Sequence, residues 1–285
     1  MSEAALPSAT RIGAVHLVVR DLERSIEFYE GALGLEEVGR SGGVARMGAG
    51  GQALLHLRGE PEAPPRPPGT TGLFHFAILV PSRPDLAASL ARLAAAGERL
   101  TGASDHLVSE ALYLRDPDGI GIEIYRDRPP SEWAYDGEEI RMASLPLDLD
   151  SILAELEPSA AAKPVAAGTR IGHVHLNVAD IAASERFYCD VLGLDVTVRS
   201  YPGALFVSAG GYHHHIGVNT WNGEGAPSPP EGSVGLERFE LVTGDDDAVA
   251  QAAGRLAKSG VPVEQRDGTV DATDPAHNGF RLLAG

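Results

Sequence analysis

The pattern of apolar and polar residues predicts the same succession of strand, helix and strands four times along the chain. In each stretch, an apolar strand is followed by a segment predicted to be helical and then by short strands separated by turns. In the first stretch we expect a strand at 14–19, a helix at about 22–33 and strands at 43–47 and 53–57. The helix has Asp21 as a plausible N-cap and Gly34 at its end.

The second stretch repeats this order after a proline-rich connection at 61–68. We expect its elements at 73–80 (strand), 84–96 (helix), 111–114 (strand) and 120–125 (strand), with Asp116–Gly119 as a turn. The third and fourth stretches run over 171–221 and from 234 to the end, the latter with a helix at 246–258. The sequence therefore predicts an α+β fold of four βαβββ modules.

Two of these modules are visibly copies of each other. The segment Ile12–Leu35 recurs as Ile171–Leu194, at an offset of 159, and 13 of its 24 residues are identical. Such a repeat implies two related domains. We expect an N-terminal domain at 1–130, a linker at 131–168 that contains a short helix at 150–157, and a C-terminal domain at 169–285.

The two copies differ at three positions that bear on chemistry. The first copy has His16, His75 and Glu123, and the second has His175, Arg238 and Arg281. Two imidazoles and a carboxylate can bind a metal ion, whereas arginines repel one. The sequence therefore predicts a metal site in the N-terminal domain and degenerate ligand positions in the C-terminal one. This prediction requires modules one and two to share a cavity. The alternative is that each histidine is a hydrogen-bonded core residue and that the carboxylate pairs with a nearby cation.

Composition limits the classes of partner and the compartment. The net charge of −17 argues against nucleic acid and anionic membranes as partners, because both need a basic patch. The lone Cys189 excludes an internal disulfide and suits a reducing compartment. Residues 1–10 show no signal peptide, and no apolar run reaches the length of a membrane span. We therefore expect a cytoplasmic protein.

Three segments carry a resemblance to a known family: Gly72–Leu79, Asp105–Leu114 and Gly210–Gly217. Together with the four modules, they resemble the vicinal oxygen chelate superfamily of glyoxalases, bleomycin-resistance proteins and extradiol dioxygenases. Within it, they resemble the two-domain catechol 2,3-dioxygenase-like branch. The resemblance implies two modules closed around each cavity. It also implies Fe(II) as the cofactor, although Mn(II), Zn(II) or Ni(II) would fit the same ligands.

The resemblance extends to residues beside the expected metal site. Tyr113 precedes Glu123 by ten residues, as the active-site tyrosine does in extradiol dioxygenases, and His106 lies in a similar histidine-containing stretch. These two would be the catalytic residues, with a loop histidine and a packed tyrosine as the alternative. One departure stands against this activity. The ring-cleaving enzymes carry a further histidine where this chain has 53–55, and the neighbouring His56 alternates with leucines and can point the wrong way.

The C-terminal half has histidines that the expected site does not use. His213, His214 and His215 align with the place where the first half lacks its histidine, and His173 and His175 share one strand face. These imidazoles could bind Zn(II), Ni(II) or Cu(II), form a hydrogen-bonded network, or bind a ligand without metal. The sequence leaves these readings open.

The leading hypothesis is a metal-dependent extradiol dioxygenase, an oxidoreductase of aromatic compound catabolism. It would cleave a catechol or related aromatic diol with O2. The alternatives are a glyoxalase-type lyase or isomerase, and a non-catalytic protein that binds an aromatic drug or natural product. A homodimer is compatible with the sequence, which does not fix the oligomeric state.

Overall fold

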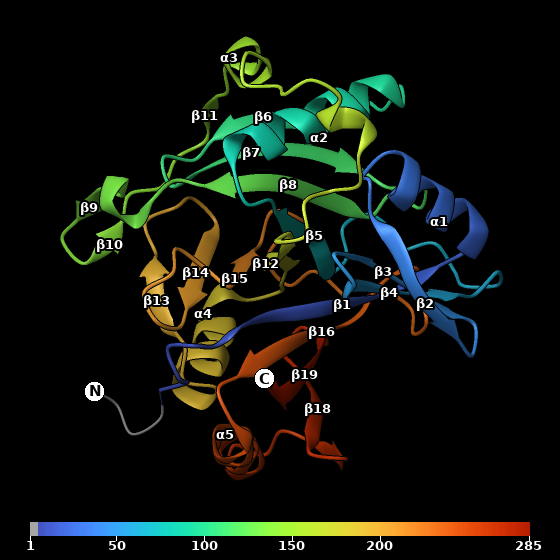
Figure 1. Cartoon of the computed structure of the whole chain (residues 1–285). Helices are drawn as coiled ribbons and strands as arrows, with labels where there is room; N and C mark the ends of the chain where they lie inside the picture. Colours follow the sequence, from blue (N-terminus) through green and yellow to red (C-terminus); the bar gives the residue numbers. More distant parts are fainter. Residues whose placement is uncertain (1–4) are drawn as a thin grey trace.

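The computed structural model describes residues 5–285 and shows two curved sheets packed against each other (Figure 1). The expectation that no signal peptide is present concerns residues 1–10, and the first four of these lie outside the described residues. Among the helices of residues 5–285, none has the length and apolar character needed to cross a membrane.

Each module contributes one strand, one helix and then three strands. Module one consists of β1 (Arg11–Val19), α1 (Leu22–Gly31), β2 (Glu36–Ser41), β3 (Val44–Ala49) and β4 (Gln52–Gly59). Module two consists of β5 (Gly72–Leu79), α2 (Arg83–Ala95), β6 (Gly102–Asp105), β7 (Ser109–Arg115) and β8 (Gly121–Asp127). Module three consists of β12 (Arg170–Asn177), α4 (Ile181–Glu185) with its π-helical continuation (Arg186–Val191), β13 (Asp195–Val198), β14 (Ala204–Ser208) and β15 (Ile216–Asn219). Module four consists of β16 (Gly235–Thr243), α5 (Asp246–Lys258), β17 (Glu264–Arg266), β18 (Thr269–Thr273) and β19 (Gly279–Ala284). The expected α+β fold of four modules is confirmed.

The helix that follows the first strand of each module begins at a side-chain cap. The capping residues are Asp21, Ser82, Asp180 and Asp245, and each accepts a hydrogen bond from a backbone N–H in the first turn. Such caps satisfy donors that have no partner within the helix. The caps therefore fix where each first strand ends and its helix begins.

The connection between modules two and three carries short elements of its own. They are 3-10 turns at Pro130–Glu132 and Ala160–Ala162, the two-residue strands β9 (Tyr135–Asp136), β10 (Glu139–Ile140) and β11 (Leu145–Pro146), and the helix α3 (Leu149–Leu153). The strand β11 pairs with β6 and so continues the sheet of module two. The linker expected at 131–168 is thus folded onto the second module for part of its length.

Module pairing does not follow the halves of the chain. Modules two and three form one nine-stranded sheet in the order β11-β6-β7-β8-β5-β12-β15-β14-β13. Modules one and four form an eight-stranded sheet in the order β17-β18-β19-β16-β1-β4-β3-β2. The requirement that modules one and two share a cavity is therefore not met. In each module the first strand lies at the edge of that module's own strands, and paired modules join through their first strands. Because all four modules offer such a strand, the repeat alone does not select which two modules pair.

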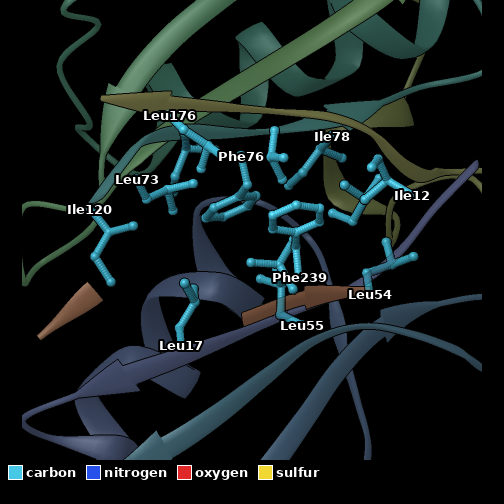
Figure 2. Packing of buried hydrophobic residues seen from close by; sticks show 14 of the residues in the cluster. Ile12, Leu17, Leu54, Leu55, Leu73, Phe76, Ile78, Ile120, Leu176 and Phe239 are labelled. Carbon is cyan, nitrogen blue, oxygen red and sulfur yellow. The ribbon is translucent and has the colours of Figure 1, made fainter. Parts of the chain in front are cut away.

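The main core lies between the two sheets (Figure 2). Phe76 on β5 and Phe239 on β16 face each other across the interface, and both are fully buried. Ile12 and Leu55 of module one pack in the same cluster, with Leu176 of module three. The first strands of the four modules thus form the centre of the molecule. The faces of β5 and β12 that point away from this core carry cavity residues such as His75 and His173.

We expect Phe76→Ala to lower the free energy of unfolding by about 3–5 kcal/mol, since truncating a buried phenylalanine leaves a cavity as well as losing transfer energy. Urea titration followed by circular dichroism measures this loss. Tyr135→Ala is the control, because that ring is 55% exposed and its removal should cost no more than about 0.5 kcal/mol. A loss below about 1 kcal/mol for Phe76→Ala would show that the sheet interface does not depend on this ring.

Candidate metal centre

A cavity of about 290 Å³ lies on the nine-stranded sheet, between modules two and three. Its polar lining is rich in imidazoles and includes His75, Tyr113, Glu123, His173, His175 and His214. Aromatic side chains form another part of its wall. Phe74 and Trp221 pack edge to face at 5.3 Å between ring centroids, and Phe206 stands near them. Flat aromatic ligands suit such walls.

Three buried side chains at this cavity can hold one metal ion. His75 on β5, Glu123 on β8 and His173 on β12 bring their ligand atoms within 4.8 Å of one another. The Oε2 atom of Glu123 lies 2.9 Å from Nε2 of His75 and 3.1 Å from Nε2 of His173. Atoms that occupy adjacent positions around a metal ion at about 2.1 Å are about 3 Å apart, so this spacing fits a shared ion.

An orphaned atom supports the same fit. Nε2 of His75 is buried and makes no hydrogen bond, although the Glu123 carboxylate is close. A buried polar atom without a partner is costly, and a metal ion would satisfy it. The donor set of two imidazoles and one carboxylate is the set found at non-haem Fe(II) sites, which keep open positions for substrate.

The protonation states also suit metal ligands. Burial alone would raise the pKa of Glu123, but His173 and His75 outweigh it and hold that pKa well below its usual range. Burial lowers the pKa of His173 to about 4, against the opposing effect of Glu123. The carboxylate is therefore ionised and the imidazole neutral near pH 7, which are the forms that bind metal.

His16, expected as the third ligand, lies elsewhere. The structure brings His75 and Glu123 together but places His16 on β1 of the other sheet, where its Nε2 atom lies 2.9 Å from Oε1 of Glu240. Its ring centroid lies 4.2 Å from that of His56, which pairs with it across β1 and β4, so His56 also belongs to that sheet and not to the cavity. The physical reason is the pairing of β1 with β16, which sets Arg238 opposite His16.

Sequence reasoning did not group His173 with His75 and Glu123, although a signal for this grouping exists. His75 precedes the helix cap Ser82 by seven residues, and His173 precedes the cap Asp180 by the same number. His16 precedes Asp21 by only five residues. Alignment on the caps, rather than on the histidines, would have selected His173 as the partner of His75.

The two residues expected to be catalytic both line the cavity. Tyr113 lies opposite Glu123 in the β7–β8 ladder, and its hydroxyl is 2.6 Å from Nε2 of His106. Nδ1 of His106 lies 2.7 Å from the carbonyl oxygen of Ala143 and must donate to it, so in the neutral ring Nε2 accepts from the tyrosine. Burial, and then Glu123, raise the pKa of Tyr113 well above its usual range, so the phenol stays protonated.

The histidine run of module three divides between the cavity and the protein interior. His214 lines the cavity, and its ring centroid is 4.1 Å from that of His173. His213 instead contacts Asp127, and His215 accepts a hydrogen bond from the backbone N–H of Ala209. The cavity histidine that the first half lacks is thus supplied by the second half. Within residues 5–285, the His75–Glu123–His173 group is the one cluster with metal-binding spacing, so a separate site among the module-three histidines is not found.

Comparison with known proteins agrees with this architecture. The model of the Glyoxalase/Bleomycin resistance protein/Dioxygenase superfamily matches residues 11–124 and 170–281. A catechol-2,3-dioxygenase of Bacillus subtilis (strain 168) is 41% identical over 276 residues, which cover 95% of this chain and 96% of that protein.

Two solved structures show the same fold at low sequence identity. A putative dioxygenase from Bacillus subtilis aligns with a TM-score of 0.68 at 15% identity, covering 99% of this chain and 86% of its own. Glyoxalase I from Zea mays aligns with a TM-score of 0.59 at 15% identity, covering 97% and 92%. On the family match and the 41% identity, the chain belongs to the Glyoxalase/Bleomycin resistance protein/Dioxygenase superfamily, in its catechol 2,3-dioxygenase-like branch.

Proposed function

We propose that the protein is an Fe(II)-dependent extradiol dioxygenase that cleaves the ring of catechol or a related aromatic diol with O2. One observation carries the proposal: the buried His75–Glu123–His173 cluster opens into an aromatic-walled cavity that also holds His214 and Tyr113. The relative named as a catechol-2,3-dioxygenase supports the same reaction class.

The ligands proposed for the ion are His75, Glu123 and His173, and His16 is not among them. When bound, the Fe(II) would supply Lewis acidity and redox chemistry toward the diol and O2. Mn(II), Zn(II) or Ni(II) would fit the same three ligands. Glu123 contributes the one negative charge of the set, so a divalent ion held by it and two imidazole ligands would keep a net positive charge that favours an anionic diolate.

The surrounding residues would position the ring and move its protons. Phe74, Phe206 and Trp221 would hold the aromatic ring against their faces. His214 would accept a proton from a diol hydroxyl. Tyr113, held by its hydrogen bond to His106, would orient a reacting oxygen atom.

We expect protein loaded anaerobically with Fe(II) to consume O2 and form a yellow semialdehyde from catechol, and Glu123→Ala to do neither. The carboxylate is 2% exposed and is shared by both histidines, so its loss removes one ligand and the anionic charge together. An oxygen electrode and absorbance spectroscopy follow the reaction, and metal analysis of both proteins completes the test.

The remaining outcomes separate the alternatives. Stoichiometric metal without oxygen uptake on any diol would contradict the dioxygenase proposal and favour glyoxalase-type lyase or isomerase chemistry. Tight binding of aromatic compounds by a protein that retains no metal would favour a non-catalytic binding role.

A further inference from the structure

A chain of hydrogen-bonded groups runs from the half-buried Asp127 through the buried His213 to the cavity histidine His214. Oδ1 of Asp127 lies 2.9 Å from Nε2 of His213, and Nδ1 of His213 lies 2.7 Å from Nδ1 of His214. His213 is completely buried and His214 is 5% exposed, with its exposed edge at the cavity. Two successive residues thus connect a carboxylate to the group proposed as the base.

The carboxylate at one end sets the direction of this chain when both imidazoles are neutral. A carboxylate only accepts, so Nε2 of His213 donates to Asp127. Nδ1 of a neutral His213 is then an acceptor, and the short contact between the two Nδ1 atoms requires Nδ1 of His214 to donate. A neutral His214 that is protonated on Nδ1 carries a bare Nε2.

We propose that Asp127 and His213 are positioning residues that hold His214 in the tautomer with an unprotonated Nε2 atom facing the cavity. This inference rests on the proposed function only for the use of His214 as a base. The tautomer itself follows from the hydrogen bonds and can be measured without turnover.

The carboxylate that starts the chain is itself held in place. Glu123, Tyr125 and Asp127 alternate along β8 and so lie on one face of the strand, which ties the metal ligand and the positioning carboxylate to the same rigid element. The Tyr212 hydroxyl donates to Oδ2 of Asp127 at 3.0 Å, and the Tyr125 hydroxyl lies 2.7 Å from that of Tyr212. Oδ1 of Asp127 is thereby left for His213.

Close packing leaves this network little freedom to rearrange. A Cβ atom added at Gly172 would lie 1.7 Å from the Tyr125 hydroxyl oxygen, so the glycine on β12 makes the room that this tyrosine needs. On the other side, the rings of Tyr212 and His213 stack at 4.1 Å. The orientation of His213 is therefore set by packing as well as by hydrogen bonds.

The test is the protonation of individual imidazole nitrogens in Asp127→Asn, a substitution that keeps the size of the side chain. An amide nitrogen turned toward His213 would donate to its Nε2 atom, which reverses every donor along the chain and places a proton on Nε2 of His214. Zn(II)-loaded protein with ¹⁵N-labelled histidine reports this directly, because protonated and bare ring nitrogens differ widely in ¹⁵N shift. His214→Gln assigns the signals.

We expect a bare Nε2 on His214 in the unmodified protein and a protonated one in Asp127→Asn. With Fe(II) bound, kcat of Asp127→Asn should fall about 100-fold, while KM changes less than about threefold and metal content is unchanged. Asp271→Asn is the matched control. It makes the same change in a half-buried carboxylate on β18 of the other sheet, where Asp271 pairs with Arg281, and should keep both the tautomer and a kcat within about threefold.

Two results would overturn the inference: a protonated Nε2 on His214 in the unmodified protein, or an unchanged tautomer in Asp127→Asn, even with lower activity. If Asp127→Asn does not fold, His213→Phe removes the acceptor for Nδ1 of His214 and should raise the Nε2-protonated fraction in the same spectrum. Absence of turnover on every diol would refute the dioxygenase proposal alone, since the spectrum decides the positioning role separately.

Discussion

His173→Ala is expected to abolish metal retention, whereas His16→Ala leaves it intact. His173 is 2% exposed, and its Nε2 atom is 3.1 Å from the Glu123 oxygen that also contacts His75. Loss of partners that merely support ligands costs about 10–100-fold in metal affinity, so loss of a ligand should cost at least about 100-fold. His16 lies on the other sheet and contacts Glu240.

The measurement is metal content after anaerobic loading with Fe(II) and gel filtration, together with competition against a chromophoric chelator. Both variants remove a buried histidine from the first strand of a module, so they control for the general cost of such a change. Retention of stoichiometric iron by His173→Ala would refute the assignment of the ligand. Loss of iron in His16→Ala with native circular dichroism would show that the two sheets cooperate in binding.

His214→Gln is expected to lower kcat by about 10²–10⁴-fold without loss of metal. This is the range by which a positioned acid or base accelerates proton transfer. His214 contacts the ring of His173 but is not one of the three clustered ligands, so the metal should stay bound. Gln offers no comparable base, and substrate binding through the aromatic walls is unaffected.

Steady-state kinetics with catechol and metal analysis test this expectation, with His215→Gln as the matched control. His215 is the next residue in the chain and just as buried, but it hydrogen-bonds to Ala209 and Ser208 rather than facing the cavity. We expect its kcat to stay within about threefold of the unmodified protein. Equal losses in the two variants would mean that His214 acts through folding.

The local structure was largely predictable from the sequence. Asp21, expected as a cap, does begin the first helix, and the first strands of modules one and two and the last helix lie within a few residues of their expected positions, because capping and apolar runs are properties of neighbouring residues. The edge strand Glu36–Ser41 was not predicted, since its residues are mostly polar and partly exposed. The linker helix expected from 150 ends at Leu153, before the exposed segment that follows.

The site was only partly predictable, for a reason that lies in tertiary structure. His75 and Glu123 belong to the same module, so the fold of that module alone brings them close together. Their positions within the module were therefore enough to predict that they meet. The third ligand and His214 come from whichever module pairs with module two, and pairing is decided by the packing of two whole sheets. Modules one and three are copies of each other, so by sequence either could pair with module two. In the structure module three, which follows the linker, is the partner.

The crossed pairing of modules also sets the order in which the molecule can be completed during synthesis. The metal cavity needs β15, so it cannot close before the chain has been made through Asn219. β1, which is made first, gains its second neighbour only when β16 has been made, more than 200 residues later. Contacts so distant in the chain carry a loop-closure cost and slow folding. For most of translation, the apolar face of module one therefore lacks module four, its final partner. This makes module one the part of the chain most exposed to pairing with a wrong strand.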